Sequence, residues 1–311
     1  MPMLEREEIR RAVQLALAED IGSGDVTTLA TVPPDATVSA SVVAREPLVV
    51  AGLDLAMAAF LELCPAVKIR RVAIDGGHVA KGGVLLEISD SQARGVLSAE
   101  RVALNFLQRL SGIATLTAQY VEAVAMTKAR ILDTRKTTPG WRKLEKYAVS
   151  CGGGVNHRFG LFDQVLIKDN HLAALGGGPL SGSLPARRGE CEEKPRAADA
   201  KVNVIEAAVL AARAHYPLLK VEVEADTLEQ VRQAAEAGAD IILLDNMTLE
   251  QLRAAVALVD GRAKTEASGG VNLSTVRAIA ETGVDFISVG ALTHSARAVD
   301  IALDFGGSAA K

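Results

Sequence analysis

The sequence predicts an α/β protein in which a strand-rich first domain of mixed α/β type is followed by a barrel of parallel strands and helices. The 311 residues are enough for a large core and two domains. From residue 130 onward, six short apolar runs alternate with segments of helical pattern, which is typical of a parallel sheet covered by helices. Polar residues end nearly every run, and such convergence at strand ends favours a barrel over an open sheet.

The first domain is expected to begin with an amphipathic helix over 4–19, because apolar residues recur there at helical spacing. The next expected elements are strands over 38–50, 68–75 and 84–88, with a helix over 54–63 among them. Ser98 is a candidate N-cap for a long helix over 99–127 that leads into the second domain.

The second domain is expected to alternate strands and helices. The expected strands cover 131–132, 165–167, 219–223, 241–244, 263–267 and 286–289. The expected helices cover 139–149, 201–214, 227–237, 248–258 and 273–282. Pro139 fits the first turn of its helix, which would fix the loop before it. Residues 176–200 break the alternation with Gly, Pro, Ser and mixed charge, so we expect a flexible surface insertion, with a structured lid as the alternative.

Composition excludes several classes of function. A formal net charge of −4 argues against a general nucleic-acid binder. No apolar run approaches the roughly 20 residues that a membrane span requires, and the first residues lack the apolar core of a signal peptide. The three cysteines are odd in number and have no CxxC spacing, which suits a reducing cytoplasm and gives no zinc signature.

Cations gather in residues 133–171, which hold seven Lys/Arg and four Asp/Glu in a chain of negative net charge. They lie beside strand ends and Gly-rich turns, at Arg135, Lys136, His157, Arg158 and Lys168. Cations in such places form a rigid pocket for small anions, so the expected ligand carries phosphates or carboxylates. A plain surface turn is the alternative for each single cation. Lys168 is also open to a role as a Schiff-base nucleophile.

Two carboxylates occupy neighbouring strand ends. Glu224 alternates with valines at the end of one expected strand, and Asp245 ends the next. Together they form a candidate Mg²⁺ site whose shell is completed by substrate oxygens. The alternative is salt bridges to Lys136 and Lys168, and the two arrangements are compatible if they belong to different states.

Glycines close the last two strand–helix turns. Ser268, Gly269 and Gly270 form one turn, and Gly290 lies in the other. Backbone N–H groups at such helix starts suit a phosphate, which β/α barrels often hold after their final strands. The alternative is that the glycines serve only the turns.

Taken together, these motifs resemble the quinolinate phosphoribosyltransferase family, also called nicotinate-nucleotide pyrophosphorylase (carboxylating). The resemblance covers nearly the whole chain in order, and its motifs are specific as a set. The matching stretches are DVTTLA (25–30), SAERVALNFLQRLSGIAT (98–115), DTRKTTPG (133–140), GGGVNHR (152–158), LIKDNH (166–171), VEVE (221–224), LLDN (243–246), SGG (268–270) and VGALTHS (289–295).

The resemblance implies the architecture and the assembly. It implies an N-terminal α/β sandwich over 1–115, completed by about 296–311, and an α/β barrel of six or seven parallel strands over 116–295 that carries the insertion at 176–200. IALDF (301–305) would pair with the first domain. The family forms dimers, and hexamers are the larger alternative. An Arg from the partner's first domain completes each active site, and Arg101 is the matching position.

The resemblance also implies the activity: a cytoplasmic, Mg²⁺-dependent enzyme of NAD biosynthesis that transfers phosphoribose from phosphoribosyl pyrophosphate (PRPP) to quinolinate. Nicotinate mononucleotide, pyrophosphate and CO2 are the products. The implied quinolinate-binding residues are Arg101, Arg135, His157, Arg158 and Lys168. The implied PRPP- and phosphate-binding residues are Lys136, Ser268, Gly269, Gly270, Gly290 and His294. Glu224 and Asp245 would hold the metal, and the implied catalytic residues are Lys136, Lys168, Glu224 and Asp245.

The sequence departs from the family pattern in two places. Trp141 follows Pro-Gly where the family often has Leu, and the 176–200 insertion is longer than the usual connection. The acidic PRPP loop of the Rossmann-like phosphoribosyltransferases is absent, which excludes that class. Two rivals remain: the family's paralogue associated with molybdate transport, and a non-catalytic anion-binding protein that kept the pocket.

Overall fold

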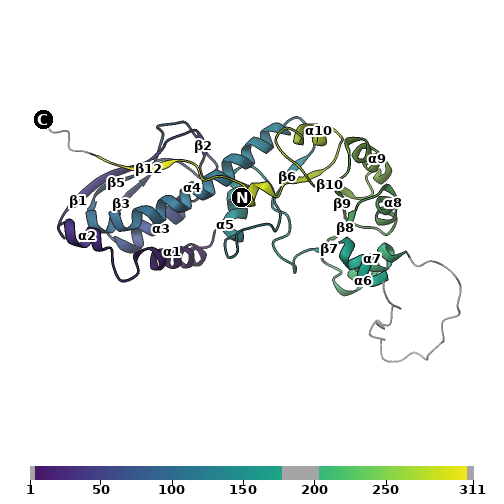
Figure 1. Ribbon diagram of the computed structural model, residues 1–311, viewed down its shortest axis with the longest axis horizontal. Helices are drawn as coiled ribbons and strands as arrows, with labels where there is room; N and C mark the ends of the chain where they lie inside the picture. The colour runs from purple at the N-terminus through teal and green to yellow at the C-terminus, as the bar shows by residue number, and fades with distance from the viewer. Residues whose placement is uncertain (1–3, 177–202, 307–311) are drawn as a thin grey trace, which may run out of the picture. The chain divides into compact units, whose positions relative to one another are not determined.

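The computed structural model describes residues 4–176 and 203–306, and the chain divides into two compact units (Figure 1). The first unit comprises Met1–Ala125, Ile131–His157 and Val289–Lys311. The second comprises Met126–Arg130 and Arg158–Ser288. The chain therefore passes between the units four times: after Ala125, within β6 (Arg130–Leu132), after His157, and at the end of β11 (Phe286–Ser288).

The first unit is built on a four-stranded antiparallel sheet in the order β12-β1-β5-β3. The strands are β1 (Thr37–Ala44), β3 (Lys68–Arg71), β5 (Val84–Gln92) and β12 (Ile301–Phe305). Val42 lies opposite Leu303 on one side and Leu86 on the other. The pairing of IALDF with the N-terminal strands is thereby confirmed. A separate two-stranded ladder joins β2 (Leu48–Val49) to β4 (His78–Val79).

Two helices cover this sheet: α3 (Leu53–Leu63) and the long α4 (Ala93–Ala123), which pack on each other (Figure 1). Their apolar faces supply fully buried side chains such as Phe60, Leu107 and Leu110, and burial of such groups is the main stabilising contribution. The helix α1 (Arg6–Ile21) packs on α3, and its first turn is closed by a capping box between Glu5 and Glu8.

Several predictions for the first unit are wrong in detail. The strand expected over 38–50 ends at Ala44, and 48–49 pair in another sheet, because Pro47 follows a turn. The strand expected over 68–75 ends at Arg71, and the one over 84–88 extends to Gln92. Ser98 is not an N-cap. It lies inside α4, and its Oγ donates a hydrogen bond to Asp25 at 2.8 Å, ahead of the unpredicted helix α2 (Val26–Thr31).

The remaining elements of the first unit follow β6 and β11. They are α5 (Arg142–Cys151) and α11 (Ala291–His294). Pro139 does not lie in the first turn of its helix, because the helix begins three residues later, after the turn that Thr138 closes with Trp141. Backbone hydrogen bonds join Val289 to Leu132 and Val155 to Ile131, so the segments after these strands are held side by side.

The second unit contains a parallel sheet in the order β11-β10-β9-β8-β7. Its strands are β7 (Val165–Ile167), β8 (Val221–Ala225), β9 (Ile241–Asp245), β10 (Lys264–Ser268) and β11. Arg130, the first residue of β6, donates its N–H to the carbonyl of Asp285 just before β11. Residues such as Val223, Ile242 and Leu244 are fully buried, which is typical of parallel strands covered on both faces.

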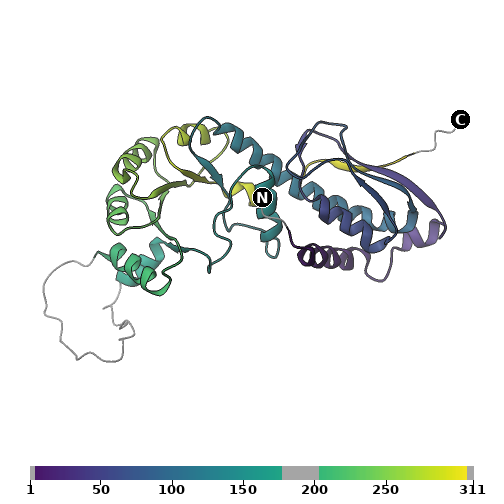
Figure 2. The ribbon, with the colours of Figure 1, turned by 180° about the vertical axis from the view of Figure 1, so that it is seen from behind.

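Helices alternate with these strands, and α8, α9 and α10 lie along the outer side of the curved sheet in both views (Figure 1 and Figure 2). The helices are α6 (Asp169–Gly176), α7 (Val204–His215), α8 (Leu228–Glu236), α9 (Leu249–Val259) and α10 (Val276–Ala280). The sequence TLEQ occurs at 227–230 and 248–251, and each copy forms a capping box that starts its helix.

The predicted fold class is confirmed: the chain is mixed α/β, with an antiparallel sheet in its first unit and strands β6 to β11 alternating with helices as in an α/β barrel. The helix expected over 273–282 is shorter than predicted, and α6 was not expected. Nearly all of the 176–200 insertion lies outside the described residues. No helix within 4–176 and 203–306 has the length and apolar character that crossing a membrane requires.

Candidate active site

The predicted site residues are distributed over both units, at strand ends or in the turns that follow. The first unit holds Arg101, Arg135, Lys136, His157, Gly290 and His294. The second unit holds Arg158, Lys168, Glu224, Asp245, Ser268, Gly269 and Gly270. Arg101 lies exposed on α4. The contacts within each unit show how the fold places the others.

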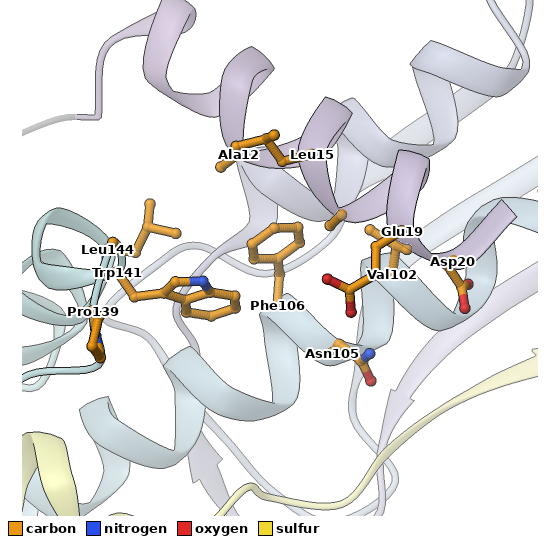
Figure 3. Close-up of a pocket in the computed structure, with 12 residues that line it drawn as sticks. Ala12, Leu15, Glu19, Asp20, Val102, Asn105, Phe106, Pro139, Trp141 and Leu144 are labelled. Carbon is orange, nitrogen blue, oxygen red and sulfur yellow. The ribbon is translucent and has the colours of Figure 1, made fainter. Parts of the chain in front are cut away.

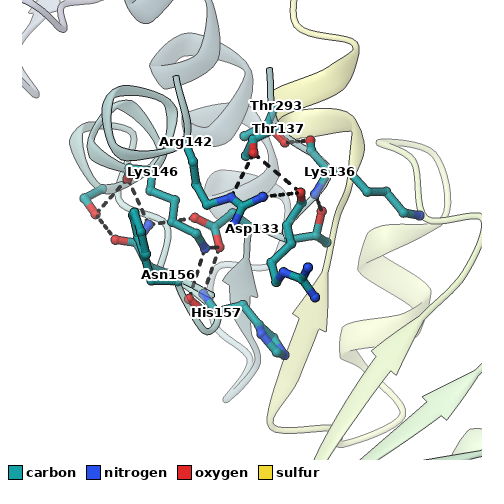
Figure 4. Close-up of polar contacts among 12 residues, drawn as sticks. Asp133, Lys136, Thr137, Arg142, Lys146, Asn156, His157 and Thr293 are labelled. Atoms are coloured by element: carbon teal, nitrogen blue, oxygen red, sulfur yellow. Dashed lines mark hydrogen bonds and ion pairs between the residues drawn. The ribbon is translucent and has the colours of Figure 1, made fainter. Parts of the chain in front are cut away.

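The loop after β6 carries Arg135 and Lys136 in a fixed conformation. Thr134 Oγ1 accepts a hydrogen bond from the N–H of Lys136 at 3.1 Å, and Thr137 donates its N–H to the carbonyl of Arg135 at 2.9 Å. Arg142 Nε then donates to Thr137 Oγ1 at 3.0 Å (Figure 4). Within the part of the chain that the structure describes, the buried Nε of Arg135 has no hydrogen-bond partner. A buried donor of this kind suits an anionic ligand.

Lys136, Gly290 and His294 come together in the first unit. A Cβ atom built on Gly290 would lie 3.1 Å from Lys136 Cδ and 3.1 Å from His294 Nε2. Thr293 Oγ1 donates a hydrogen bond to the carbonyl oxygen of Lys136 at 2.6 Å, which ties the turn after β11 to the loop after β6 (Figure 4). Three residues predicted to bind PRPP are thus neighbours although 158 positions separate the first from the last (294 − 136).

His157 is held through its backbone by two buried groups that sequence reasoning did not select, Asp133 and Lys146. Its N–H donates to Asp133 Oδ1 at 2.8 Å, and its carbonyl accepts from Lys146 Nζ at 3.0 Å. Asn156 Nδ2 donates to the other Asp133 oxygen at 2.7 Å (Figure 4). Burial raises the pKa of Asp133, and the donors from Lys146, His157 and Asn156 oppose that rise.

Glu145 was also missed, although it organises the same loop. It is fully buried and accepts hydrogen bonds from the N–H of Thr138 at 3.1 Å and from Thr138 Oγ1 at 2.8 Å. Arg109 Nη2 donates to it at 2.9 Å. The only signal in the sequence is the adjacent Glu-Lys pair within an amphipathic helix, and most such pairs lie on solvated faces.

In the second unit, Lys168 and Glu224 form an ion pair across β7 and β8. The register pairs Ile167 with Val223, so the residues that follow each lie side by side. The predicted salt bridge to Lys168 is therefore present. Glu224 lies within β8 rather than just past its end, because the strand begins and ends two residues later than predicted.

Asp245 ends β9, the strand next to β8, and Asn246 Nδ2 donates to its Oδ2 at 2.6 Å. Glu224 is paired in register with Leu243, so the two carboxylates belong to adjacent strands near the same end of the sheet. Carboxylate oxygens are the ligands that Mg²⁺ prefers, and two carboxylates on adjacent strand ends suit a metal site whose remaining ligands come from elsewhere.

The Ser268-Gly269-Gly270 turn needs its glycines. Gly269 has φ +95°, and a Cβ atom there would lie only 2.0 Å from Asn246 Oδ1. Gly270 has φ +61° with open space around its Cα. The N–H of Asn246 donates to the carbonyl of Ser268 at 2.9 Å, so the turns after β9 and β10 pack closely. Glycine here serves the close approach of two backbones, whatever ligand the turn binds.

Arg158 is nearly buried and is fixed by the strand that it precedes. Its Nη1 donates to the carbonyl of Gln164 at 3.1 Å, and Gln164 Nε2 in turn donates to the buried Glu222. The guanidinium is thereby held at its Nη1 atom, which limits its motion. Arg158, Gln164 and Glu222 all belong to the second unit.

A pocket of about 450 Å³ in the first unit is lined by α1, α4 and the turn before α5 (Figure 3). Leu15, Phe106 and Trp141 form its apolar wall, and Glu19 and Asp20 lie at one end. The rings of Phe106 and Trp141 stack with centroids 5.3 Å apart, which accounts for a Trp at this position. None of the predicted site residues lines this pocket, so it is distinct from the candidate site.

Comparison with known proteins gives a consistent result over the whole chain. The family model described as "Quinolinate phosphoribosyl transferase, N-terminal domain" matches residues 25–111, and the corresponding C-terminal domain model matches 113–304. A protein of Mycobacterium leprae named nicotinate-nucleotide pyrophosphorylase (carboxylating) is 44% identical over 306 residues, which cover 96% of this chain and 98% of that protein.

Solved structures of proteins with the same name are similar to this chain over nearly its whole length. The structure of the nicotinate-nucleotide pyrophosphorylase from Francisella tularensis has a TM-score of 0.85 at 36% identity and covers 98% of each chain. The crystal structure of the nicotinate-nucleotide pyrophosphorylase from Ehrlichia chaffeensis has a TM-score of 0.84 at 37% identity. The match covers 98% of this chain and 100% of that one.

Proposed function

Because this chain belongs to the quinolinate phosphoribosyltransferase family, we propose that it transfers phosphoribose from PRPP to quinolinate and releases nicotinate mononucleotide, pyrophosphate and CO2. This is a step of NAD biosynthesis and makes the chain a pentosyltransferase. The single observation that carries the site assignment is the buried guanidinium Nε of Arg135, which has no hydrogen-bond partner among the described residues and suits a carboxylate of the substrate.

In the proposed binding of quinolinate, the carboxylates are bound by cationic residues, two of which are held by hydrogen bonds to neighbouring protein groups. Arg135, His157, Arg158 and Lys168 would bind the two carboxylates, and Arg101 of a second subunit would complete the set. Because the backbone of His157 and the guanidinium of Arg158 are already held, little conformational entropy remains to be lost on binding. Quinolinate would be oriented with its ring nitrogen toward the sugar, which raises the effective concentration of the nucleophile.

Lys136, His294 and Gly290 would bind the pyrophosphate side of PRPP, and Ser268, Gly269 and Gly270 its 5′-phosphate. In the reaction the ring nitrogen forms a bond to C1′ while the bond from C1′ to the pyrophosphate oxygen breaks. Positive charge develops on the ribose, and the carboxylates of Glu224 and Asp245 would stabilise it. The bond to the 2-carboxylate then breaks as CO2, and the electron pair left on the ring takes up a proton.

Mg²⁺ would be held by Glu224 and Asp245 together with oxygens of PRPP, and when bound it would neutralise charge on the departing pyrophosphate. The Lys168–Glu224 ion pair bears on this proposal, because Lys168 would exchange Glu224 for a substrate carboxylate as the site fills. We also propose a homodimer with sites completed across the interface, in accord with the exposed position of Arg101 on α4. Hexameric assembly and a cytoplasmic location remain predictions from the sequence.

The deciding experiment measures PRPP-dependent consumption of quinolinate with Mg²⁺, by chromatography of nicotinate mononucleotide and by release of labelled CO2. Formation of both products in equal amounts is expected, and chelation of Mg²⁺ by EDTA should abolish it. Absence of turnover by folded protein with saturating substrates would remove the proposal and leave the paralogue associated with molybdate transport or a non-catalytic anion-binding protein.

The dimer has its own test. Arg101→Ala and Lys136→Ala variants are each expected to be inactive. After unfolding and refolding together, random pairing in a twofold dimer should restore about a quarter of the wild-type activity, because one site of each mixed dimer is intact. No recovery in mixed dimers that have been demonstrated by mass would show that each site is built from one chain.

A further inference from the structure

Two adjacent residues of α5 are charged and buried. Glu145 is 0% exposed and Lys146 is 3% exposed. Neighbouring side chains on a helix point about 100° apart, so the two reach different partners. Buried charges of this kind are rare unless paired, and apolar residues of the same size would hold a helix in place at lower cost. Their retention on one helix calls for a role beyond packing.

Glu145 connects to the residues predicted to bind PRPP. Besides holding both donors of Thr138, it pairs with Arg109, whose guanidinium also donates to the carbonyls of Thr293 and Ala296, the latter at 2.6 Å. Thr293 Oγ1 in turn donates a hydrogen bond to the carbonyl oxygen of Lys136, so this network returns to the loop that Thr138 belongs to. One carboxylate thus fixes the loop of Lys136 and, through one guanidinium, the turn that ends at His294.

Lys146 connects to the residue predicted to bind quinolinate. Its ammonium donates to Asp133 and to the carbonyl of His157, while Asp133 accepts the N–H of the same His157 (Figure 4). The backbone of His157 is therefore held at both of its polar groups by one ion pair. The side chain of Glu145 thus leads to Thr138 and Arg109, whereas the ammonium of Lys146 leads to Asp133 and His157, so the two networks diverge from neighbouring positions.

We propose that Glu145 and Lys146 are positioning residues with divided tasks: Glu145 sets the groups that bind PRPP, and Lys146 sets the group that binds quinolinate. This inference rests on the proposed function for the roles of Lys136, His294 and His157. Neither residue touches substrate. Each acts by fixing the backbone that carries a substrate-binding side chain, which is how a supporting shell holds a site to within a fraction of an ångström.

The kinetic test compares Glu145→Gln, Lys146→Met and, as the matched control on the same helix, Lys143→Met, which removes only a partly exposed ion pair with Glu8. Glu145→Gln should raise the KM for PRPP by about 10-fold or more with a small change for quinolinate, and Lys146→Met should do the reverse. Lys143→Met should match the wild type. Equal changes in both KM values in both variants would indicate general loss of structure and overturn the division of tasks.

A second measurement is independent of activity. Backbone hydrogen exchange should quicken in residues 134–138 for Glu145→Gln and in 155–158 for Lys146→Met, with each variant leaving the other segment protected. Faster exchange in both segments, or in neither, would overturn the proposal. If the wild type makes no nicotinate mononucleotide, the proposed function falls, and the exchange pattern alone still decides whether the two networks act separately.

Removing one partner of a buried ion pair leaves the other uncompensated, so a variant that does not fold is a foreseeable result for Lys146→Met. The double variant Asp133→Asn/Lys146→Met removes both charges and retains similar volumes. It should fold and still raise the KM for quinolinate and the exchange rate of residues 155–158. A folded double variant with wild-type values in both measurements would overturn the role of Lys146.

Discussion

Lys168 and Glu224 form an ion pair that joins β7 to β8, and both residues are predicted to act in catalysis. The side chain of Lys168 is 43% exposed, whereas that of Glu224 is 10% exposed. The register of the two strands places them side by side, so the pair follows directly from the sheet. Under the proposed mechanism, Mg²⁺ would replace Lys168 as the partner of Glu224, and Lys168 would then bind a substrate carboxylate.

Glu224→Gln and Lys168→Met are expected to lower kcat/KM at least about 100-fold. Glu224→Gln should change the free energy of unfolding by less than about 1 kcal/mol, because it removes the nearly buried charge and leaves Lys168 exposed to solvent. Arg213→Met is the control, since it breaks a pair with Asp240 in the same unit, and Asp240 precedes β9, at the opposite end of that strand from Asp245. Urea unfolding and steady-state kinetics check both parts. A Glu224→Gln variant with normal turnover would exclude Glu224 from the mechanism.

Gly269→Ala should destabilise the protein by about 3 kcal/mol and abolish binding of PRPP, because it combines a strained φ with a collision against Asn246. Gly261→Ala is the matched control. Gly261 also has a positive φ, +73°, but nothing lies within 4 Å of the added Cβ. Gly261→Ala should lower the free energy of unfolding by about 1 kcal/mol and leave activity intact. Equal destabilisation by the two substitutions would show that the contact with Asn246 is not restrictive.

Gly290→Ala tests the cluster of Lys136, Gly290 and His294 without strain, since Gly290 has φ −63°, which alanine adopts freely. The added methyl group would crowd Lys136 Cδ and His294 Nε2. We expect the KM for PRPP to rise about 10-fold and the melting temperature to change little. An unchanged KM for PRPP with a raised KM for quinolinate would assign this cluster to the other substrate.

Stability at acid pH should depend on Glu46, which lies between β1 and β2. Hydrogen bonds from Arg297 and from the N–H of Asp300 lower the pKa of Glu46 from 4.5 to about 2. A lowered pKa in the folded state means that the contribution is present above pH 4.5 and is lost as the pH falls toward 2. Urea midpoints of wild type and Glu46→Gln should therefore differ at neutral pH and converge in acid. A constant difference would contradict the assignment.

Cys151 should be inert in the folded protein. Burial, with a smaller contribution from the nearby Asp75 carboxylate, raises the pKa of its thiol to about 12, so the reactive thiolate is scarce at neutral pH. Iodoacetamide at about pH 8 should leave Cys151 unmodified until denaturant is added, as peptide mass mapping would show. Rapid modification of Cys151 in native conditions would mean that the C-terminal end of α5 unfolds locally. Cys191 lies outside the described residues, and Cys64 is buried, so it should be out of reach of the reagent until the protein unfolds.

Much of the fold was predictable because its signals are local. Apolar runs such as residues 241–244 predict buried strands whatever surrounds them, and the two TLEQ segments predict the starts of α8 and α9 through contacts within four residues. The predictions fail where a local signal is overridden. Ser98 has the chemistry of a cap, but α4 continues through it, because the helix is long and packed and the hydroxyl finds Asp25 instead.

The residue types at the strand ends can be read from the sequence alone, and they predict both an anionic ligand and the resemblance to one family. Which charges are buried, and which groups they contact, depends on how distant segments pack together. Glu145 and Lys146 are indistinguishable from a solvated pair until Arg109, 36 positions before one, and Asp133, 13 positions before the other, are brought to them. Burial and pairing are properties of groups that meet across the fold, so no window of sequence contains them.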